Sequence, residues 1–519
     1  MRRAGIWAVA ACAVLSIAAG GPGARNAWPR QPRPNMVLIV ADDLGYGDLS
    51  SYGHRVLKTP SIDRLATEGL RFTSYYAASP LCSPSRAAMM TGRTPFRTGI
   101  ETWIPPAADV QLGRREITIA TLLARSGYQT FLSGKWHLNG GLDNARQAQP
   151  QDHGFPHWLA FHGWAIPHHR DPTNFFRDGV AVGEIKGFAA QIVVDEAMGW
   201  LDRRQKDAPF FLYVAFAEPH STIANPDRFN AMYSAYTDGT PDPMANADVP
   251  PGNIAARGPG EYYANVAHMD YQAGRLLEHL DSLGLRENTV VVFTSDNGPV
   301  TTDWRQWYEV NLYGSTGNLR GRKGDLYDGG IRVPAIVRWP GHTAAGRATD
   351  APAIGYDLLP TLAAIAGVPV PADRAIDGED LSAVLSGTPF ERRRPLYWEF
   401  DDSHGFLRHP RRAMEAAGGR SVRQSAALRP RRRSVRGHRS RRGGPGRREA
   451  PARPTARPPR RCHERPAQAA EDRRTLAGRR AAEPLRRRQA VDQRVGHGTV
   501  GSLDEFQTVL LDQLKEPRG

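Results

Sequence analysis

The sequence predicts an α/β fold in which helices cover both faces of a large, mostly parallel β-sheet. Continuous apolar runs of strand length support this prediction, because strands of a parallel sheet are buried on both faces. Helical patterns separate these runs, as expected when crossover helices join parallel strands. The chain has 519 residues, 40% of them hydrophobic, enough for one large domain and a smaller one. The predicted strands cover residues 35–41, 128–133, 209–216 and 289–295.

The predicted helices have recognisable ends. A helix over residues 61–69 is predicted to begin with Ser61 as its N-cap and to stop at Gly69. A long amphipathic helix over residues 261–283 is closed by Gly284. In sheets of this kind, ligands bind beyond the carboxyl ends of the strands. The residues that follow each strand are therefore the first candidates for a functional site.

Oxygen-bearing side chains follow two of the predicted strands. Asp42 and Asp43 follow the first strand, and Asp296 and Asn297 follow the last. A turn would explain either pair alone equally well, because turns favour Asp and Asn. Two such pairs at two strand ends instead indicate a cation site. Oxygen ligands without a histidine or a second cysteine suit Ca²⁺ or Mg²⁺ rather than zinc.

Cys82 stands at the predicted start of a helix, since Pro84 suits a helix start and helix-forming residues follow it. Free N–H groups at that position favour an anion, and Arg86 is close enough along the helix to reach the same anion. Three cysteines occur, of which Cys12 falls in a predicted leader, so no disulfide framework is expected. Cys82 is therefore either a small buried hydrophobe or a reactive group.

The stretch C-S-P-S-R…T-G-R, which begins at Cys82, resembles the signature of the sulfatase family, in which the cysteine is oxidised to formylglycine. The resemblance covers residues 33 to 410 and is strongest to arylsulfatase A-like and N-acetylgalactosamine-sulfatase-like members. The other matching motifs are V-A-D-D-L-G-Y-G-D with Asp42 and Asp43, S-G-K-W-H-L with Lys135 and His137, A-E-P-H with His220, T-S-D-N-G with Asp296 and Asn297, and R-K-G-D-L-Y-D-G-G-I-R-V-P with Lys323.

The resemblance implies an alkaline-phosphatase-like sandwich and a sulfuric ester hydrolase with one bound Ca²⁺. The implied substrate is a sulfated carbohydrate or an aryl sulfate, and the implied partner is a formylglycine-generating enzyme that converts Cys82 to 3-oxoalanine. The implied metal ligands are Asp42, Asp43, Cys82, Asp296 and Asn297.

The resemblance also implies a role for each catalytic residue. One hydroxyl of the hydrated formylglycine would attack sulfur, while the cation and three basic side chains stabilise charge on the sulfate oxygens. His220 would protonate the departing alcohol. His137 would then take the proton of the second hydroxyl, which expels sulfate and regenerates the aldehyde. The implied catalytic residues are Cys82, Arg86, Lys135, His137, His220 and Lys323.

Each of these side chains has a simpler explanation when it is taken singly. Lys135 and Lys323 could face water, and His137 and His220 could be ordinary histidines near strand ends. All of these explanations would have to hold together beside an intact Cys82 motif, which favours the catalytic interpretation. Two rival functions remain: a phosphomonoesterase or phosphodiesterase of the same architecture, and a catalytically inactive protein that binds anionic polymers.

The first residues have the pattern of a secretory signal. Two arginines precede an uncharged apolar run from Ala4 to Ala19, and small residues continue to Ala24. We therefore expect a signal peptide at residues 1–24 and export to the periplasm or the extracellular space. No later stretch is long and apolar enough for a membrane span.

Residues 152–171 are rich in histidine and contain Trp158 and Trp164. This segment is either the wall of a sugar-binding cleft or an irregular surface excursion, and it lacks a recognisable zinc-ligand spacing. Its histidines are His153, His157, His162, His168 and His169.

The C-terminal part departs from the family pattern, because an arginine-rich tail replaces most of an expected small subdomain, which is left truncated or corrupted. Such a composition buries too little apolar surface to fold, so we expect disorder there. The tail is either a natural extension that binds nucleic acid or another anionic polymer, or the product of a shifted reading frame, which we favour. Sequencing the gene across codons 405–500 distinguishes the two.

The predicted divisions are a catalytic domain at 33–390, the start of the subdomain at 391–410 with a first strand at 395–400, the tail at 411–500 and a short helix within 501–519.

The formal charge of +15 at pH 7 belongs to the tail. Residues 411–519 carry a net charge of +18, whereas the residues before them carry −3. The catalytic domain is therefore nearly neutral, and we expect no nucleic-acid partner for it.

Overall fold

The computed structural model describes residues 33–237, 258–300, 310–400 and 412–416. The predicted signal peptide, the tail beyond residue 416 and the predicted C-terminal helix lie outside the described residues. Among the helices of the described part, none is long and apolar enough to cross a membrane.

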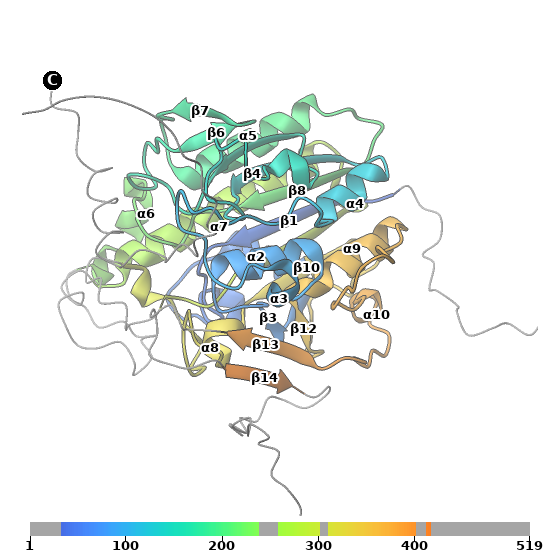
Figure 1. Ribbon diagram of the computed structural model, residues 1–519. Helices are drawn as coiled ribbons and strands as arrows, with labels where there is room; N and C mark the ends of the chain where they lie inside the picture. The colour runs from blue at the N-terminus through green and yellow to red at the C-terminus, as the bar shows by residue number, and fades with distance from the viewer. Residues whose placement is uncertain (1–32, 238–257, 301–309, 401–411, 417–519) are drawn as a thin grey trace, which may run out of the picture. The chain divides into compact units, whose positions relative to one another are not determined.

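A ten-stranded sheet forms the centre of the described chain (Figure 1), in the order β11-β2-β10-β9-β1-β8-β4-β5-β6-β7. The central strands β9, β1, β8, β4 and β5 all run parallel. The predicted α/β fold with a large sheet is therefore confirmed. The strands are β1 (Asn35–Ala41), β2 (Leu70–Phe72), β4 (Gln129–Lys135), β5 (His157–Phe161), β6 (Phe175–Arg177), β7 (Val180–Gly183), β8 (Phe210–Ala215), β9 (Thr289–Ser295), β10 (Ala335–Arg338) and β11 (Arg347–Thr349).

The flanks of the sheet are mixed, so "mostly parallel" describes its centre and not its edges. β10 pairs antiparallel with β9 and β2, and β6 pairs antiparallel with β5 and β7. β6 and β7 form a hairpin whose turn residues, Asp178 and Gly179, have φ angles of 50° and 91°. A tight hairpin turn requires such positive φ angles, and Asp-Gly supplies them at low cost. This turn signal is present in the sequence, but the predicted strands do not include the hairpin.

Helices cover both faces of the sheet (Figure 1). Alternate residues of β1 point to opposite faces, and each set lies in a separate hydrophobic cluster. One cluster contains residues of α2, α4 and α9, and the other contains residues of α1, α5 and α7. These helices are α1 (Pro60–Glu68), α2 (Cys82–Thr91), α4 (Ile119–Arg125), α5 (Ala189–Arg203), α7 (Gly260–Ser282) and α9 (Leu358–Ala366).

Helix α1 begins earlier than predicted. Its N-cap is Thr59, so the prediction of Ser61 as N-cap is wrong. The reason is Pro60, which suits the first helical position because its missing N–H would have no partner there. The N–H groups of Ser61 and Ile62 instead donate to the two carboxylate oxygens of Asp270, at 3.1 and 2.8 Å. Asp270 belongs to α7, so a residue distant in the sequence caps this helix.

The other predicted elements form close to their expected ends. β1 and β9 have the predicted bounds, and β4 extends past its predicted end to Lys135. The remaining elements are short: strands β3 (Tyr75–Tyr76) and β12 (Ala353–Ile354), helices α3 (Pro95–Thr98), α6 (Asp227–Met232), α8 (Asp328–Ile331) and α10 (Ser382–Leu385), and 3₁₀ turns at Ser50–Tyr52, Pro150–His153, Ser234–Tyr236, Arg286–Asn288, Val310–Tyr313 and Gly355–Asp357.

A two-stranded sheet follows at the C-terminal end of the described chain. Strand β13 (Leu396–Phe400), close to the predicted strand at 395–400, pairs antiparallel with β14 (Arg412–Ala416). Residues 412–416, which fall within the predicted tail, pair through their backbone with β13. The inward side chains of β13 pack in one cluster with Leu81, next to Cys82. Among them, Trp398 donates from Nε1 to Ala77 O at 2.8 Å.

Candidate active site

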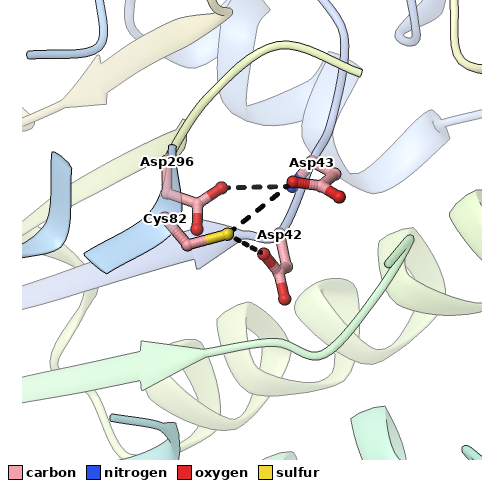
Figure 2. Close-up of side chains that lie close together, drawn as sticks. All are labelled: Asp42, Asp43, Cys82 and Asp296. Carbon is pink, nitrogen blue, oxygen red and sulfur yellow. Dashed lines mark hydrogen bonds between the residues drawn. The ribbon is translucent and has the colours of Figure 1, made fainter. Parts of the chain in front are cut away.

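The predicted site residues gather at the carboxyl ends of the central parallel strands. Asp42 and Asp43 follow β1, Asp296 follows β9, and Cys82 is the first residue of α2. Figure 2 shows these four side chains turned toward one another. One potential ligand atom of each lies within 4.8 Å of those of the other three, and all four residues are buried. Strand ends and a helix start thus converge as the sequence predicts.

Cys82 lies against two of the carboxylates. Its Sγ is 3.6 Å from Asp42 Oδ1 and 3.9 Å from Asp43 Oδ1. The N-cap position of α2 is Leu81, whose side chain does not cap the helix, so the first N–H groups of α2 are not satisfied by a side-chain cap there. Burial raises the pKa of the Cys82 thiol above its usual range. An unmodified Cys82 would therefore remain a neutral thiol in this pocket.

Three basic side chains pair with the buried carboxylates. Arg86 donates from Nε to Asp296 Oδ2 at 2.8 Å, and its terminal nitrogen lies 3.8 Å from Asp42. Lys135, the last residue of β4, donates to Asp42 Oδ2 at 2.6 Å. Lys323 donates to Asp43 Oδ2 at 2.8 Å. Buried carboxylates are tolerated only when they are paired in this way.

The pKa values of the two neighbouring carboxyls Asp42 and Asp296 move in opposite directions. Burial raises the pKa of Asp42 above its usual range; Lys135 opposes this shift, and the adjacent carboxylates add to it. Burial also acts to raise the pKa of Asp296, but Arg86 and the two lysines outweigh it and hold that pKa below its usual range. Negative charge at Asp42 is therefore incompletely compensated by the protein's own cations, and a bound metal ion would favour its ionised form.

Asn297 completes a set of oxygen donors. Its Nδ2 donates to Asp43 Oδ1 at 2.7 Å and to Gly298 O at 2.8 Å. Its Oδ1 is buried and has no hydrogen-bond partner among the described residues. A buried amide oxygen without a partner is costly, and a cation would satisfy it. The donors are carboxylate and amide oxygens with no histidine among them, which fits a hard divalent cation.

His220 lies beside the carboxylate cluster and is partly exposed. Its Nε2 is 3.7 Å from Asp43 Oδ2, and its Nδ1 donates to Ser221 O at 2.5 Å. Burial lowers the pKa of His220 to about 4, although Asp43 opposes this shift. The side chain of His220 is 18% exposed, whereas that of Asp43 is fully buried.

His137 is near the cluster but is held by other partners. Its Nε2 lies 3.0 Å from Ile104 O, and its ring packs edge-on against that of His162. Its Nδ1 is buried without a hydrogen-bond partner among the described residues. Burial and the nearby charge of Lys135 lower the pKa of His137 well below its usual range. His137 is thus a neutral imidazole with one unused nitrogen.

Two residues that support the site are absent from the predicted set. Tyr213 of β8 accepts a hydrogen bond from Arg86 at 3.2 Å, and a hydroxyl within a buried apolar strand was the available signal. Glu218 follows β8 in the A-E-P-H motif. Its carbonyl accepts from Asp42 N at 2.9 Å, and its carboxylate accepts from Ala190 N at 2.8 Å at the start of α5. Glu218 therefore links the strand end that bears Asp42 to a neighbouring helix.

The chain matches the Sulfatase family model over residues 34–368, a span that includes every predicted site residue. Arylsulfatase A of Homo sapiens is 36% identical over 414 residues, covering 74% of this chain and 73% of that protein. N-acetylgalactosamine-6-sulfatase of Canis lupus familiaris is 32% identical over 412 residues, covering 75% and 72%. The crystal structure of Ps i-CgsB in complex with k-i-k-neocarrahexaose has a TM-score of 0.63 and 28% identity, covering 74% of this chain and 82% of that one.

Replacement of Arg86 by methionine is expected to lower the free energy of unfolding by about 3–5 kcal/mol, because Asp42 and Asp296 would keep their burial and lose a cation. Urea denaturation of wild type and R86M measures the difference. The control is R114M, because Arg114 pairs with Asp152 at the surface, where such pairs contribute less than about 1 kcal/mol. Equal losses in the two variants would contradict the expected dependence on burial.

Proposed function

The chain belongs to the sulfatase family of sulfuric ester hydrolases, and we propose that it acts through a formylglycine made from Cys82 and a bound Ca²⁺. The position of Cys82 carries this proposal. Its Sγ lies 3.6 and 3.9 Å from Asp42 and Asp43, at the first turn of α2. An oxygen nucleophile at this position would face both the cation ligands and a helix N-terminus, which attracts an anion such as sulfate.

Conversion of Cys82 to formylglycine supplies an oxygen nucleophile, which the buried thiol cannot provide. Burial raises the pKa of the thiol, so little thiolate forms in the folded site. A hydrated formylglycine supplies one hydroxyl to attack sulfur and a second from which the aldehyde is restored. Serine has no second hydroxyl and cannot release sulfate in this way. We therefore propose a formylglycine-generating enzyme as a partner of this chain.

Lys135 and Lys323 are proposed to bind the sulfate oxygens. Each ammonium has three N–H donors, and the two ammonium groups lie beside Asp42 and Asp43 respectively. Arg86 is proposed to act mainly by position and charge. Both of its contacts to Asp296 are 2.8 Å long, so it holds that carboxylate in place while it adds positive charge near the reacting group.

His220 is proposed to protonate the departing alcohol oxygen. Its Nδ1 carries a proton because it donates to Ser221 O, so Nε2 is the atom available for proton transfer. Its pKa of about 4 refers to a pocket without substrate. A sulfate group beside the ring adds negative charge, which favours the imidazolium form that an acid requires.

His137 is proposed as the base that assists the release of sulfate. Its Nε2 must carry the proton in order to donate to Ile104 O, which leaves the lone pair on Nδ1. This is the nitrogen without a partner among the described residues. The low pKa keeps the ring neutral near pH 7, which is the form that a base requires.

We propose Ca²⁺ as the bound cation, because the oxygen donors of the site suit a hard divalent ion. Asp42, Asp43, Asp296 and Asn297 Oδ1 would hold it, together with an oxygen on residue 82. When bound, the cation would supply positive charge to the sulfate oxygens and make the attacking hydroxyl more acidic.

Sulfated carbohydrates and aryl sulfates are the proposed substrates. The relatives include an arylsulfatase and an N-acetylgalactosamine-6-sulfatase, and a similar solved structure contains k-i-k-neocarrahexaose. Family membership and a cysteine at the nucleophile position favour a sulfatase over a phosphoesterase of the same architecture. The leader-like sequence at residues 1–24 supports the further proposal that the chain is exported.

Co-production with a formylglycine-generating enzyme is expected to lower the intact mass by about 18 Da, the change from a cysteine to formylglycine. This protein should hydrolyse 4-nitrophenyl sulfate repeatedly. Cys82→Ser should stop after at most one turnover, because it cannot release the bound sulfuryl group. The matched control is the same chain made without the modifying enzyme. Full activity of that unmodified protein would refute the proposed nucleophile.

Calcium added to chelator-treated protein is expected to raise the melting temperature, because an ion that binds only the folded state adds about 2.7 kcal/mol at a hundredfold excess over its Kd. Asn297→Ala should need more calcium for the same shift, since it removes one oxygen donor. Asp195→Asn, at an exposed acidic residue of α5, should respond like wild type. If calcium did not change the melting temperature of the wild-type protein, the proposal that the site binds Ca²⁺ would be contradicted.

His220→Ala is expected to slow the hydrolysis of alkyl or sugar sulfates by about 10²–10⁴-fold. The loss should be much smaller with 4-nitrophenyl sulfate, because nitrophenolate leaves without being protonated. Comparison of kcat for the two substrate types provides the measurement. His157→Ala, at an imidazole that is 72% exposed and paired with Asp178, should change neither rate. An equal loss on both substrate types would exclude His220 as the acid.

A further inference from the structure

A short segment after β5, His162-Gly163-Trp164, contacts both candidate proton-transfer histidines. The ring of His162 lies 5.0 Å from that of His137, measured between centroids. Gly163 passes so close that a Cβ added there would lie 3.4 Å from His137 Nε2. The indole of Trp164 is nearly parallel to the imidazole of His220, with centroids 6.5 Å apart and an angle of 9° between the rings. These three consecutive residues therefore lie against both histidines and form a segment that we call the wall of the site.

The backbone and the neighbouring residues anchor this wall. Asn174 donates from Nδ2 to Trp164 O at 2.8 Å and accepts from Ile166 N at 2.9 Å. Phe161 and Ala165, on either side of the segment, are fully buried, whereas Trp164 is only partly buried. Asn174 and two buried neighbours therefore hold the backbone of this loop in place beside the two histidines.

We propose that Trp164 selects the alcohol part of the substrate by contacting the ring that carries the departing oxygen. The inference rests on the proposed role of His220, because the oxygen that receives its proton must lie beside its imidazole. Trp164 lies beside the same imidazole.

An indole face binds flat apolar surfaces, such as an aryl ring or the C–H face of a pyranose. The charge of the sulfate group is met elsewhere, by the lysines that lie beside Asp42 and Asp43. The preferred substrates are therefore sulfate esters of ring alcohols rather than of short alkyl chains, and Trp164 supplies the preference.

The test compares cyclohexyl sulfate with ethyl sulfate, two alkyl esters that differ in the presence of a ring. In Trp164→Ala, kcat/KM for cyclohexyl sulfate should fall about tenfold, mainly through KM, as expected for the loss of an aromatic contact of roughly 1.4 kcal/mol. Trp164→Phe should keep part of the preference. Ethyl sulfate should change less than about twofold in either variant, because it makes little contact with the indole.

A binding measurement separates this inference from the proposed function. In a Cys82→Ala background, which has no nucleophile at position 82, Trp164→Ala should weaken the binding of cyclohexyl sulfate and leave the binding of inorganic sulfate unchanged. If the formylglycine form did not hydrolyse sulfate esters, the proposed function would be contradicted, while the role of Trp164 in binding would be unaffected. The control is Arg170→Ala, a substitution at an exposed residue of the same loop, which should not change the affinity for either ligand. If Trp164→Ala weakened the binding of both ligands equally, or of neither, the proposed role of Trp164 would be wrong.

Discussion

The burial of three carboxylates in one pocket is the constraint on which the rest of the structure depends. Asp42, Asp43 and Asp296 are almost completely inaccessible, and such burial costs several kcal/mol per ion unless cations and hydrogen bonds offset it. The compensating charges come from α2, from the end of β4 and from the loop before α8. Because these segments are far apart in the sequence, the pocket can exist only in the assembled domain.

Parallel pairing at the centre of the sheet makes this assembly possible. β1 and β9 are in register to their last residues, Ala41 and Ser295, so the next residue of each strand leaves the sheet at the same edge. Asp43 N then donates to Asp296 Oδ1 at 3.1 Å, which fixes one carboxylate by the backbone of the other loop. The antiparallel strands lie outside this central group, where they extend the sheet without disturbing the shared edge.

Features encoded by short stretches of sequence were predictable, and those made by distant residues were not. An apolar run followed by Asp42 or Asp296 reveals a strand end without knowledge of the fold. The cap that Asp270 provides for α1 joins segments that no local pattern relates. The role of Glu218 was not predictable for a similar reason, since its partners are Asp42, which follows β1, and Ala190 of α5. For Trp164 the sequence was compatible with either a cleft wall or a surface loop, and the structure places its indole beside the imidazole of His220.

The attachment of β13 has a practical consequence for protein engineering. Trp398 hydrogen-bonds to Ala77 O and shares its hydrophobic cluster with Leu81, the residue before Cys82. A protein truncated before Phe400 would expose the hydrophobic cluster that contains Leu81. The start of α2, which carries residue 82, would then be less firmly packed. Affinity tags, fusion partners and immobilisation linkers are therefore best joined beyond β13, so that the support beneath the reactive centre stays intact.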